Sequence, residues 1–305
     1  MTKGVLIVNG YMRTEKFEEI TRLYKVASEK VKITLEVWYT DEIVYGFQID
    51  HSPFINKSIK DISFVLFLDK DIMLARQLER LGLRVFNSAH AIEVCDNKAM
   101  TLESLVGSGI ACPITRIAPL VFKGMYEGDK EDAYISQLES ELGYPMVIKE
   151  CYGSFGMQVY LARNRQELIA IRKKVIDVPH LYQAFICTSI GRDVRIHVVG
   201  GKVVASMMRC NQEDFRANIT NGGQMYHYEP SEAFKEMACQ VCRQLGLDFA
   251  GVDLMFGPDE TPILCEVNSN AHIKNILELT GINIAEKIMA YIVKEVTNDE
   301  GLTDL

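Results

Sequence analysis

The chain has 305 residues, of which 48% are hydrophobic and 24% are charged, and its formal net charge is -8. This is an ordinary globular composition, and its negative charge argues against nucleic acid or an anionic membrane as the main partner. The apolar run at the N-terminus is too short for a signal peptide, and the longest run elsewhere, residues 62–68, cannot span a bilayer. We therefore expect a cytoplasmic protein with two or three lobes that binds neither nucleic acid nor a membrane.

Strand-like and helix-like segments alternate through the first third of the chain. Strands are expected at GVLIVN, ITLEVWY, FVLFL and RVFN, and helices from about Glu15 and from Ile72 to Leu81. Such alternation is typical of a parallel sheet with crossover helices. The following segment, AIEVCDNKAMTLESLVGSGIACPIT, predicts one helix that ends at glycine, followed by a strand entered through proline.

From Ala133 onward the order of segments changes to that of an α+β module. The sequence predicts a helix, a strand (YPMVIKE), a loop, a strand (VYLAR), a helix (Gln166 to Val175) and a strand (LYQAFI). From Gly191 we expect antiparallel strands, a helix from Ser231, two more strands and one closing helix.

Eight cysteines raise the question of disulfides or zinc. In a chain of this length without a secretion signal we expect them to be reduced. The one C-x-x-C pair, Cys239 and Cys242, lies in a segment with helical apolar spacing, which predicts that Cys242 is a small hydrophobic residue on a buried face.

The stretch VIKECYGSFGMQV sets Lys149 at the end of an apolar run, just before a glycine-containing loop. An ammonium and exposed backbone N–H groups both favour anions, which suggests a phosphate site. Neither G-x-x-x-x-G-K-[ST] nor G-x-G-x-x-G is present, so a hairpin loop with a surface lysine is an equally good interpretation of this stretch alone.

The segment FAGVDLMFGPDETPILCEVNSN predicts a hairpin that holds a metal. A loop centred on GPDET pairs Phe256 with Ile263 and brings Asp253 opposite Glu266. Facing carboxylates repel unless a positive charge lies between them, and alternation adds Asn268 to the face of Glu266. An oxygen-only set of this kind suits magnesium. The alternative is a solvated polar face with a chance register.

A second hairpin, GRDVRIHVVGGKVVASMMR, turns at a glycine pair. Alternation predicts Asp193, Arg195 and His197 on one face, with Ser206 opposite Arg195. Arg209 falls on the other face unless a bulge intervenes. In the loop that follows, DFRANITNGG contains Arg216 and Asn218. The alternative for the arginines is surface charge, and for His197 this alternative is the favoured one.

Taken in order, these segments resemble an ATP-grasp enzyme of the RimK-like glutamate ligase group. The resemblance runs from about Asp69 to Lys294 through CDNKAMT, GIACPIT, PMVIKECYGSFGMQV, YQAFI, GRDVRIHVVGGKVVA, DFRANITNGG, GVDLMF and LCEVNSN. It implies an N-terminal parallel α/β pre-ATP-grasp domain (residues 1–95), followed by a two-subdomain ATP-grasp fold. The first subdomain (residues 96–186) would carry the glycine loop and the second (residues 187–305) the magnesium site.

The resemblance also implies roles for individual residues. Catalytic roles fall to Arg195 and Lys149, and magnesium would bind Asp253, Glu266 and Asn268. The ATP contacts it implies are Lys98, Lys149, Gly153, Ser154, Gly156, Gln183, Ala184, Phe185, Asp193, Arg209, Arg216 and Asn218. Ala184 and Phe185 form the hinge that reads adenine, and Asp193 contacts the ribose. The family often continues after Asn268 with Ser-Pro-Gly, whereas this chain has SNAHIKN, on the acceptor side.

The activity that the resemblance implies is ATP-dependent amide formation through an acyl phosphate, with release of ADP and phosphate. The ligase would add glutamate or a similar amino acid to an amine acceptor, with two magnesium ions expected and manganese as an alternative. The acceptor is a small molecule, a peptide or a protein, and the chain could be a homo-oligomer. Two alternatives stay open: an ATP-binding regulatory module without catalysis, and a peptide ligase of the D-alanine–D-alanine type.

Overall fold

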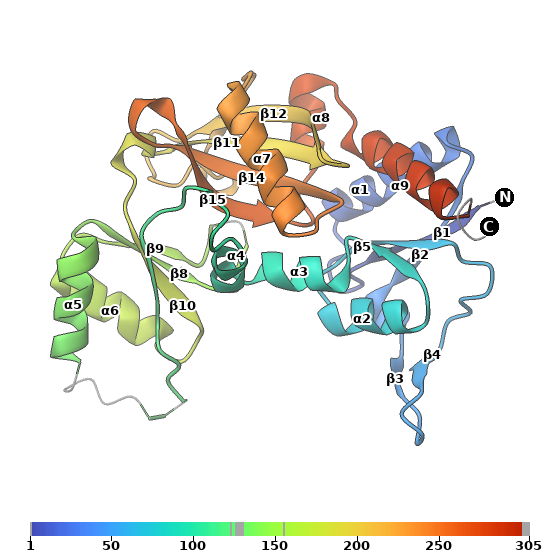
Figure 1. The fold of residues 1–305 in the computed structure, drawn as a ribbon, viewed down its shortest axis with the longest axis horizontal. Helices are drawn as coiled ribbons and strands as arrows, with labels where there is room; N and C mark the ends of the chain where they lie inside the picture. Colours follow the sequence, from blue (N-terminus) through green and yellow to red (C-terminus); the bar gives the residue numbers. More distant parts are fainter. Residues whose placement is uncertain (1, 123, 126–130, 155, 301–305) are drawn as a thin grey trace.

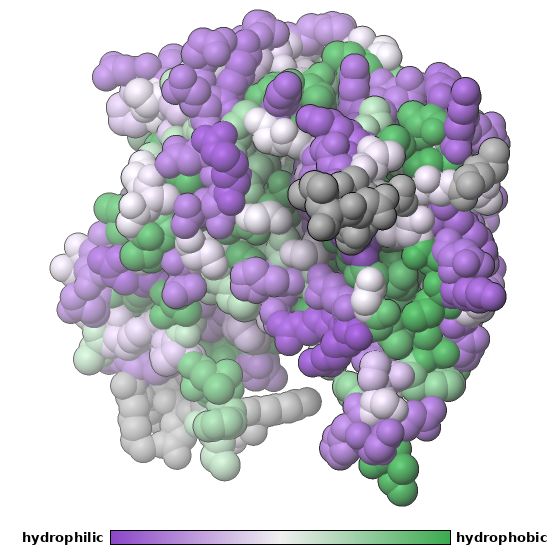
Figure 2. Space-filling view, turned by 45° about the vertical axis from the view of Figure 1, so that its right-hand side comes forward, coloured by the Kyte–Doolittle hydropathy of each residue, from purple (hydrophilic) through white to green (hydrophobic). Residues whose placement is uncertain are grey.

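The computed structural model describes residues 2–122, 124–125, 131–154 and 156–300. Three lobes make up the molecule, each built on its own sheet (Figure 1). A gap separates the lower parts of the first and second lobes on the face shown in Figure 2. Among the described residues, no helix has the length and apolar content needed to cross a bilayer.

The first lobe contains the parallel sheet that the sequence predicts, in the order β2-β1-β5-β6. Its elements are β1 (Lys3–Val8), α1 (Glu15–Lys30), β2 (Thr34–Tyr39), β3 (Tyr45–Phe47), β4 (Pro53–Ile55), β5 (Phe64–Leu68), α2 (Ile72–Arg80) and β6 (Arg84–Phe86). The β3–β4 hairpin, which the sequence analysis missed, projects away from the sheet (Figure 1).

The single helix predicted after the first sheet is wrong. Two helices, α3 (Ala89–Asp96) and α4 (Lys98–Ser104), meet at Asn97, whose backbone is extended (φ -107°, ψ 107°). The Asn97 side chain accepts hydrogen bonds from the backbone N–H groups of Ala99 and Met100, and so caps α4. This break makes Lys98 the first residue of α4, beside the glycine loop.

The second lobe is an antiparallel sheet in the order β7-β10-β8-β9, with α5 and α6 over one face (Figure 1). Its elements are β7 (Thr115–Ile117), α5 (Asp132–Leu142), β8 (Met146–Glu150), β9 (Val159–Ala162), α6 (Arg165–Val175) and β10 (His180–Ala184). Their order is the one predicted from the sequence.

The third lobe is a five-stranded antiparallel sheet in the order β13-β12-β11-β14-β15, with α7 against one face. Its elements are β11 (Arg192–Val199), β12 (Lys202–Cys210), β13 (Gln224–Tyr226), α7 (Glu232–Gln244), β14 (Phe249–Phe256), β15 (Pro262–Asn268), α8 (Lys274–Thr280) and α9 (Ile284–Glu300). The one closing helix that we predicted is two, since Gly281 at φ 72° ends α8.

One hydrophobic cluster joins the first and third lobes. It contains Leu6 and Phe64 of the parallel sheet together with Phe249 of β14 and Ile288 of α9. The buried Asn87 side chain adds hydrogen bonds to the backbone of residues 248, 249 and 269. These two lobes therefore share one core, and the domain limits at residues 95 and 186 stay a prediction.

The cysteines behave as the sequence predicts. All eight are free, and Cys242 is buried in the cluster under α7. Within the described part of the chain, no three His, Cys, Asp or Glu side chains are grouped to hold a metal by themselves.

Candidate active site

A cleft of about 270 Å³ opens where the three lobes meet. Its walls come from the carboxyl ends of β1 and β5, one side of α1, the loop after β8, the sheet of the third lobe and residues 269–275. Ligands of open parallel sheets bind at this edge, since the loops there are free to form a site. The cleft therefore places the first lobe opposite the polar strands of the third.

The β14–β15 hairpin brings Asp253 directly opposite Glu266, which confirms that prediction. The predicted pairing of Phe256 with Ile263 is wrong, because Ile263 pairs with Met255 and Phe256 with Pro262. Cys265 has no partner between these two registers, so it forms a bulge. The acidic pair therefore lies on the far side of the bulge from the turn.

The β11–β12 hairpin contains a similar bulge. Pairing shifts by one residue after His197, so Met207, and not Ser206, stands opposite Arg195. The same shift sets Arg209 opposite Asp193, on the face from which simple alternation excludes it. The bulge that we named as the exception is present, and it brings a second arginine to the acidic residues.

Asp253 is held by both arginines. Arg195 Nε and Nη2 each lie 2.7 Å from one of its carboxylate oxygens, and Arg209 Nη2 lies 2.9 Å from Oδ2. Arg209 also donates from Nε to Asp193 Oδ1 at 2.7 Å. Burial acts to raise the pKa of Asp253, but the two guanidinium groups outweigh it and hold that pKa well below its usual range. Asp253 is therefore ionised at neutral pH.

His197 lies next to this network but plays no acid–base part at neutral pH. Burial, together with the charge of Arg195, lowers its pKa to about 3. The side chain is therefore neutral and buried, so the surface position favoured for it from the sequence is wrong.

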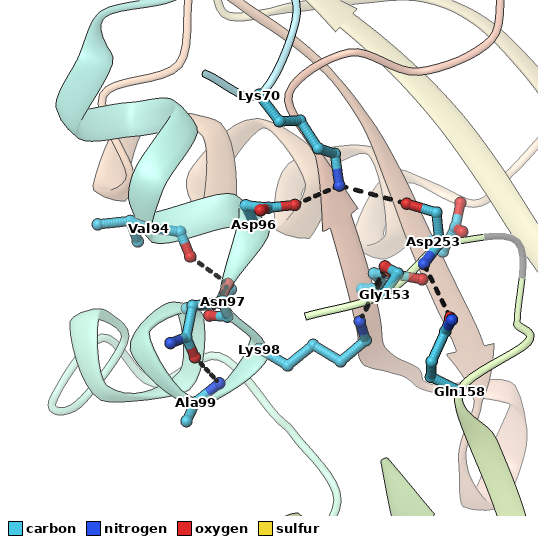
Figure 3. A network of polar contacts seen from close by, with 12 residues as sticks. Lys70, Val94, Asp96, Asn97, Lys98, Ala99, Gly153, Gln158 and Asp253 are labelled. Atoms are coloured by element: carbon cyan, nitrogen blue, oxygen red, sulfur yellow. Dashed lines mark hydrogen bonds and ion pairs between the residues drawn. The ribbon is translucent and has the colours of Figure 1, made fainter. Parts of the chain in front are cut away.

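Glu266 is balanced by a lysine. Lys98 Nζ lies 3.5 Å from Glu266 Oε1 and donates a hydrogen bond to the Gly153 carbonyl at 3.3 Å. Figure 3 shows Lys98 reaching toward the glycine loop from below while Lys70 approaches it from the first lobe. The positive charge beside the facing carboxylates thus comes from protein side chains, with Arg195 and Arg209 on Asp253 and Lys98 on Glu266.

Lys149 lies on β8 and is only 8% exposed. It pairs with Leu181 and Val159 in the sheet, and its charge is felt by the thiol of Cys265 on β15. A lysine buried to this extent is not a surface residue, so the alternative of a hairpin loop with a surface lysine is wrong. Its role as a phosphate contact stays a prediction.

The glycine loop touches the loop that carries Arg216 and Asn218. Arg216 Nη1 donates to the Gly156 carbonyl at 2.6 Å. Gly156 has φ +71°, and a Cβ there would come within 2.7 Å of Asn218 Oδ1. Within the loop, the Ser154 backbone N–H donates to Gln158 Oε1 at 3.2 Å. Residues 153–156 form the glycine loop, which we expect to close over the phosphates, and Phe155 of this loop lies outside the described residues.

The predicted hinge lies at the end of β10. Gln183 and Ala184 are the last two residues of this strand, and Phe185 directly follows it. The Ala184 backbone N–H donates to the Ile114 carbonyl at 2.9 Å, and the Gln183 side chain donates to Thr115. Phe185 contacts Phe215, with ring centroids 6.2 Å apart. Since its N–H is already used, Ala184 can offer an adenine ring no backbone donor in this conformation.

The donor set fits magnesium when phosphate supplies further oxygens. Asp253, Glu266 and Asn268 provide two carboxylates and one amide from adjacent strands, and magnesium is usually held by one or two carboxylates plus substrate phosphates. The Asn268 amide nitrogen is buried without a hydrogen-bond partner among the described residues. An unsatisfied amide at this position is suited to a bound ligand.

Sequence reasoning missed the contribution of the first lobe to this cleft. Asp69 and Lys70 follow β5, while Lys16 lies on α1 and His272 follows the acidic hairpin; all four line the cleft. The sequence held a signal for the first two, because side chains after parallel strands meet at one edge of the sheet. His272 directly follows residues 269–271, where the family often has Ser-Pro-Gly; burial and the charges of Lys16 and Arg195 lower its pKa to about 4.

Comparisons with known proteins agree with this geometry. A family model described as a RimK-like ATP-grasp domain matches residues 95–292. An uncharacterized protein of Mycoplasma pneumoniae, the MG012 homolog, is 32% identical over 89% of this chain and 92% of its own length. Human N-acetylaspartylglutamate synthase A is 33% identical over 75% of this chain. A probable alpha-L-glutamate ligase of Histophilus somni is 36% identical over 65% of this chain.

The chain matches only 57% of the length of the human synthase and 64% of the Histophilus protein. Among solved structures, a RimK domain protein of Sphaerobacter thermophilus has TM-score 0.71 at 19% identity, covering 95% of this chain and 99% of that one. D-alanine–D-alanine ligase of Bacillus anthracis complexed with ATP has TM-score 0.70 at 18% identity, covering 99% and 100%. These structures show the fold, and the family model together with the sequence relatives shows the family. The chain belongs to the RimK-like ATP-grasp family of carboxylate-amine ligases.

Proposed function

We propose that the chain uses ATP to convert a carboxylate into an acyl phosphate and then joins the acyl group to the amine of glutamate or a similar amino acid. ADP and phosphate are the other products. One observation carries the proposal: Glu266, Arg195 and Arg209 line one cleft, and the buried Asp253 lies directly behind them, opposite Glu266 and ion-paired with both arginines. Phosphoryl transfer requires little of a protein except positioning and charge neutralisation, which such a set provides.

Each residue has a part in this reaction. Lys149 on β8 and Lys98 at the start of α4 hold the ATP phosphates. Arg216 and Asn218 approach the same phosphates from the loop that touches Gly156. Asp253, Glu266 and Asn268 would hold magnesium, as two ions, which would neutralise charge on the phosphates.

Arg195 is the proposed catalytic cation. Its guanidinium is held in place by two hydrogen bonds to Asp253, and its side chain is only 13% exposed. A fixed, water-poor positive charge stabilises the anionic oxygens of an acyl phosphate and of the tetrahedral species that follows. The acidic partner keeps Arg195 oriented before substrate arrives.

The names of the relatives support glutamate as a substrate. N-acetylaspartylglutamate synthase, beta-citrylglutamate synthase and alpha-L-glutamate ligase all name it. In the first two products, glutamate is the part whose amino group carries the acyl group. We therefore assign glutamate to the amine side, whereas the sequence alone led us to expect it as the group that is added.

Trapping the acyl phosphate tests this function. The enzyme is incubated with ATP, magnesium and candidate carboxylates such as N-acetylaspartate, citrate and short acidic peptides, with hydroxylamine in place of the amine. We expect a hydroxamate, one ADP for each hydroxamate, and loss of both in Asp253→Asn. AMP and pyrophosphate as products would refute phosphorylation of the carboxylate. Tight ATP binding without hydroxamate from any carboxylate would favour a non-catalytic ATP-binding module.

A further inference from the structure

The first lobe contributes one acid to the cleft whose chemistry the proposed reaction has not yet used. Asp69 directly follows β5, lines the cleft and is 7% exposed. Its Oδ1 accepts hydrogen bonds from the backbone N–H groups of Lys70 and Asp71, at 2.6 and 3.0 Å. Its Oδ2 is buried and has no hydrogen-bond partner among the described residues.

The two oxygens of Asp69 therefore have different uses. Oδ1 stabilises the turn into α2, a local role that a neutral asparagine also fills. Oδ2 is a buried acceptor without a hydrogen-bond partner among the described residues. Burial raises the pKa of this carboxyl, while the nearby backbone N–H groups and the Asn9 side chain act against that shift. Leaving a buried acceptor unsatisfied costs free energy, so such an atom in a ligand cleft indicates that a ligand supplies the donor.

The rest of the cleft limits what that donor can be. Lys16 and Lys70 line the cleft from the first lobe, and Arg195 faces them from the third. The positive end of a substrate avoids these groups. Two other acids line this side of the cleft, but Glu18 is exposed to solvent and Asp96 is paired with Lys70, which leaves Asp69 as the buried acid without an ion pair in the described part of this lobe. Phe17, Ile20 and Leu68 supply an apolar wall to the same cleft, which suits the methylene part of an amino acid.

We propose that Asp69 is the specificity residue for the amine substrate and that its Oδ2 accepts a hydrogen bond from that substrate's ammonium group. The ligand class is an α-amino acid, or a peptide with a free amino group, whose carboxylates face the cations of the cleft. This inference rests on the proposed function, because in that reaction the amine is the one substrate group that must arrive positively charged. The carboxylate substrate and ATP bring negative charge instead.

The experiment compares two acceptors of the same acyl phosphate in the Asp69→Asn enzyme. Glutamate must present an ammonium group, whereas hydroxylamine is uncharged at neutral pH and has no need of a carboxylate partner. We expect the KM for glutamate to rise about 10- to 100-fold, the loss expected for one charged hydrogen bond. The ratio of amide to hydroxamate should fall at least about tenfold.

Asp71→Asn is the matched control. Asp71 belongs to the same turn, caps α2 through Leu74 and accepts a hydrogen bond from Tyr45, but it does not line the cleft. Its variant disturbs the turn equally and should keep the wild-type ratio. Equal loss of amide and hydroxamate in Asp69→Asn, an unchanged ratio, or a raised KM for the carboxylate substrate alone would each overturn the assignment.

A binding measurement on the wild-type protein decides the question without a variant. Glutarate matches glutamate in length but lacks the amino group, so in the presence of ATP and magnesium it should bind at least about tenfold more weakly. Equal binding of the two would overturn the role of Asp69. Failure of wild-type protein to form any hydroxamate would instead refute the proposed function, while this comparison would still report on the ammonium subsite.

Discussion

The buried ion-pair network offers a sharp test of the structure. Arg209 is 3% exposed and lies between Asp193, which is 7% exposed, and Asp253, which is 2% exposed. In Arg209→Met, Asp253 keeps both hydrogen bonds from Arg195, but Asp193 loses its bidentate partner in a buried site. Breaking a buried pair costs about 3–5 kcal/mol, so we expect a loss of this size in the free energy of unfolding at pH 7.

The pH dependence separates this cause from a packing defect. Burial already raises the pKa of Asp193, with Arg209 opposing the shift, so removing the arginine raises that pKa further. When the folded state has the higher pKa, it binds more protons than the unfolded state, and stability is lost as the pH rises. Lowering the pH from 7 to 5 should therefore restore up to about 1.4 kcal/mol for each pH unit to the variant.

Urea unfolding at pH 7 and pH 5 measures both effects. The double variant Asp193→Asn with Arg209→Met should be more stable at pH 7 than Arg209→Met, because no unpaired charge is left in the site. The control Arg163→Met removes an exposed i,i+4 ion pair and should change stability by less than about 0.5 kcal/mol at both pH values. A loss in Arg209→Met that is the same at both pH values, with no recovery in the double variant, would refute the reasoning.

Three further predictions concern the nucleotide and its metal. ATP at 100 times its Kd should stabilise the protein by about 2.7 kcal/mol with magnesium and much less with EDTA, because the metal set includes phosphate oxygens; equal thermal shifts would contradict this. Glu266→Gln should lower kcat by about 100-fold or more, because a charged ligand of the metal is lost, with an unchanged unfolding midpoint, because the ion pair of Glu266 with Lys98 is long and partly exposed; near-normal turnover would exclude Glu266 from the site. Lys149→Ala should raise the Kd for ATP by about 10- to 100-fold in a titration, because a buried ammonium contact to phosphate is lost; an unchanged Kd would place the grip elsewhere.

The family and most of the helices and strands could be predicted from the amino-acid sequence. Apolar periodicity found the parallel sheet and the order of strands and helices in the second lobe, because burial imposes a period on every strand and helix. Hairpin pairing also put Asp253 opposite Glu266, although the register assumed at the turn was wrong and the bulge at Cys265 makes up the difference. Besides the apolar periods, the serial motifs indicated ATP-grasp. These are local properties, so they can be read from a short stretch of chain.

The balance of charges in the site could not be predicted, because it depends on how the strands and lobes pack. The bulges at Cys265 and after His197 shift the register by one residue, and such a shift moves side chains to the other face, which no pattern of alternation reveals. The break at Asn97 and the arrival of Asp69 at the cleft likewise depend on contacts between distant segments. A contact between segments that are far apart in the chain produces no periodic pattern in the sequence. The cations beside the acidic pair and the unsatisfied oxygen of Asp69 could therefore be identified only from the packed lobes.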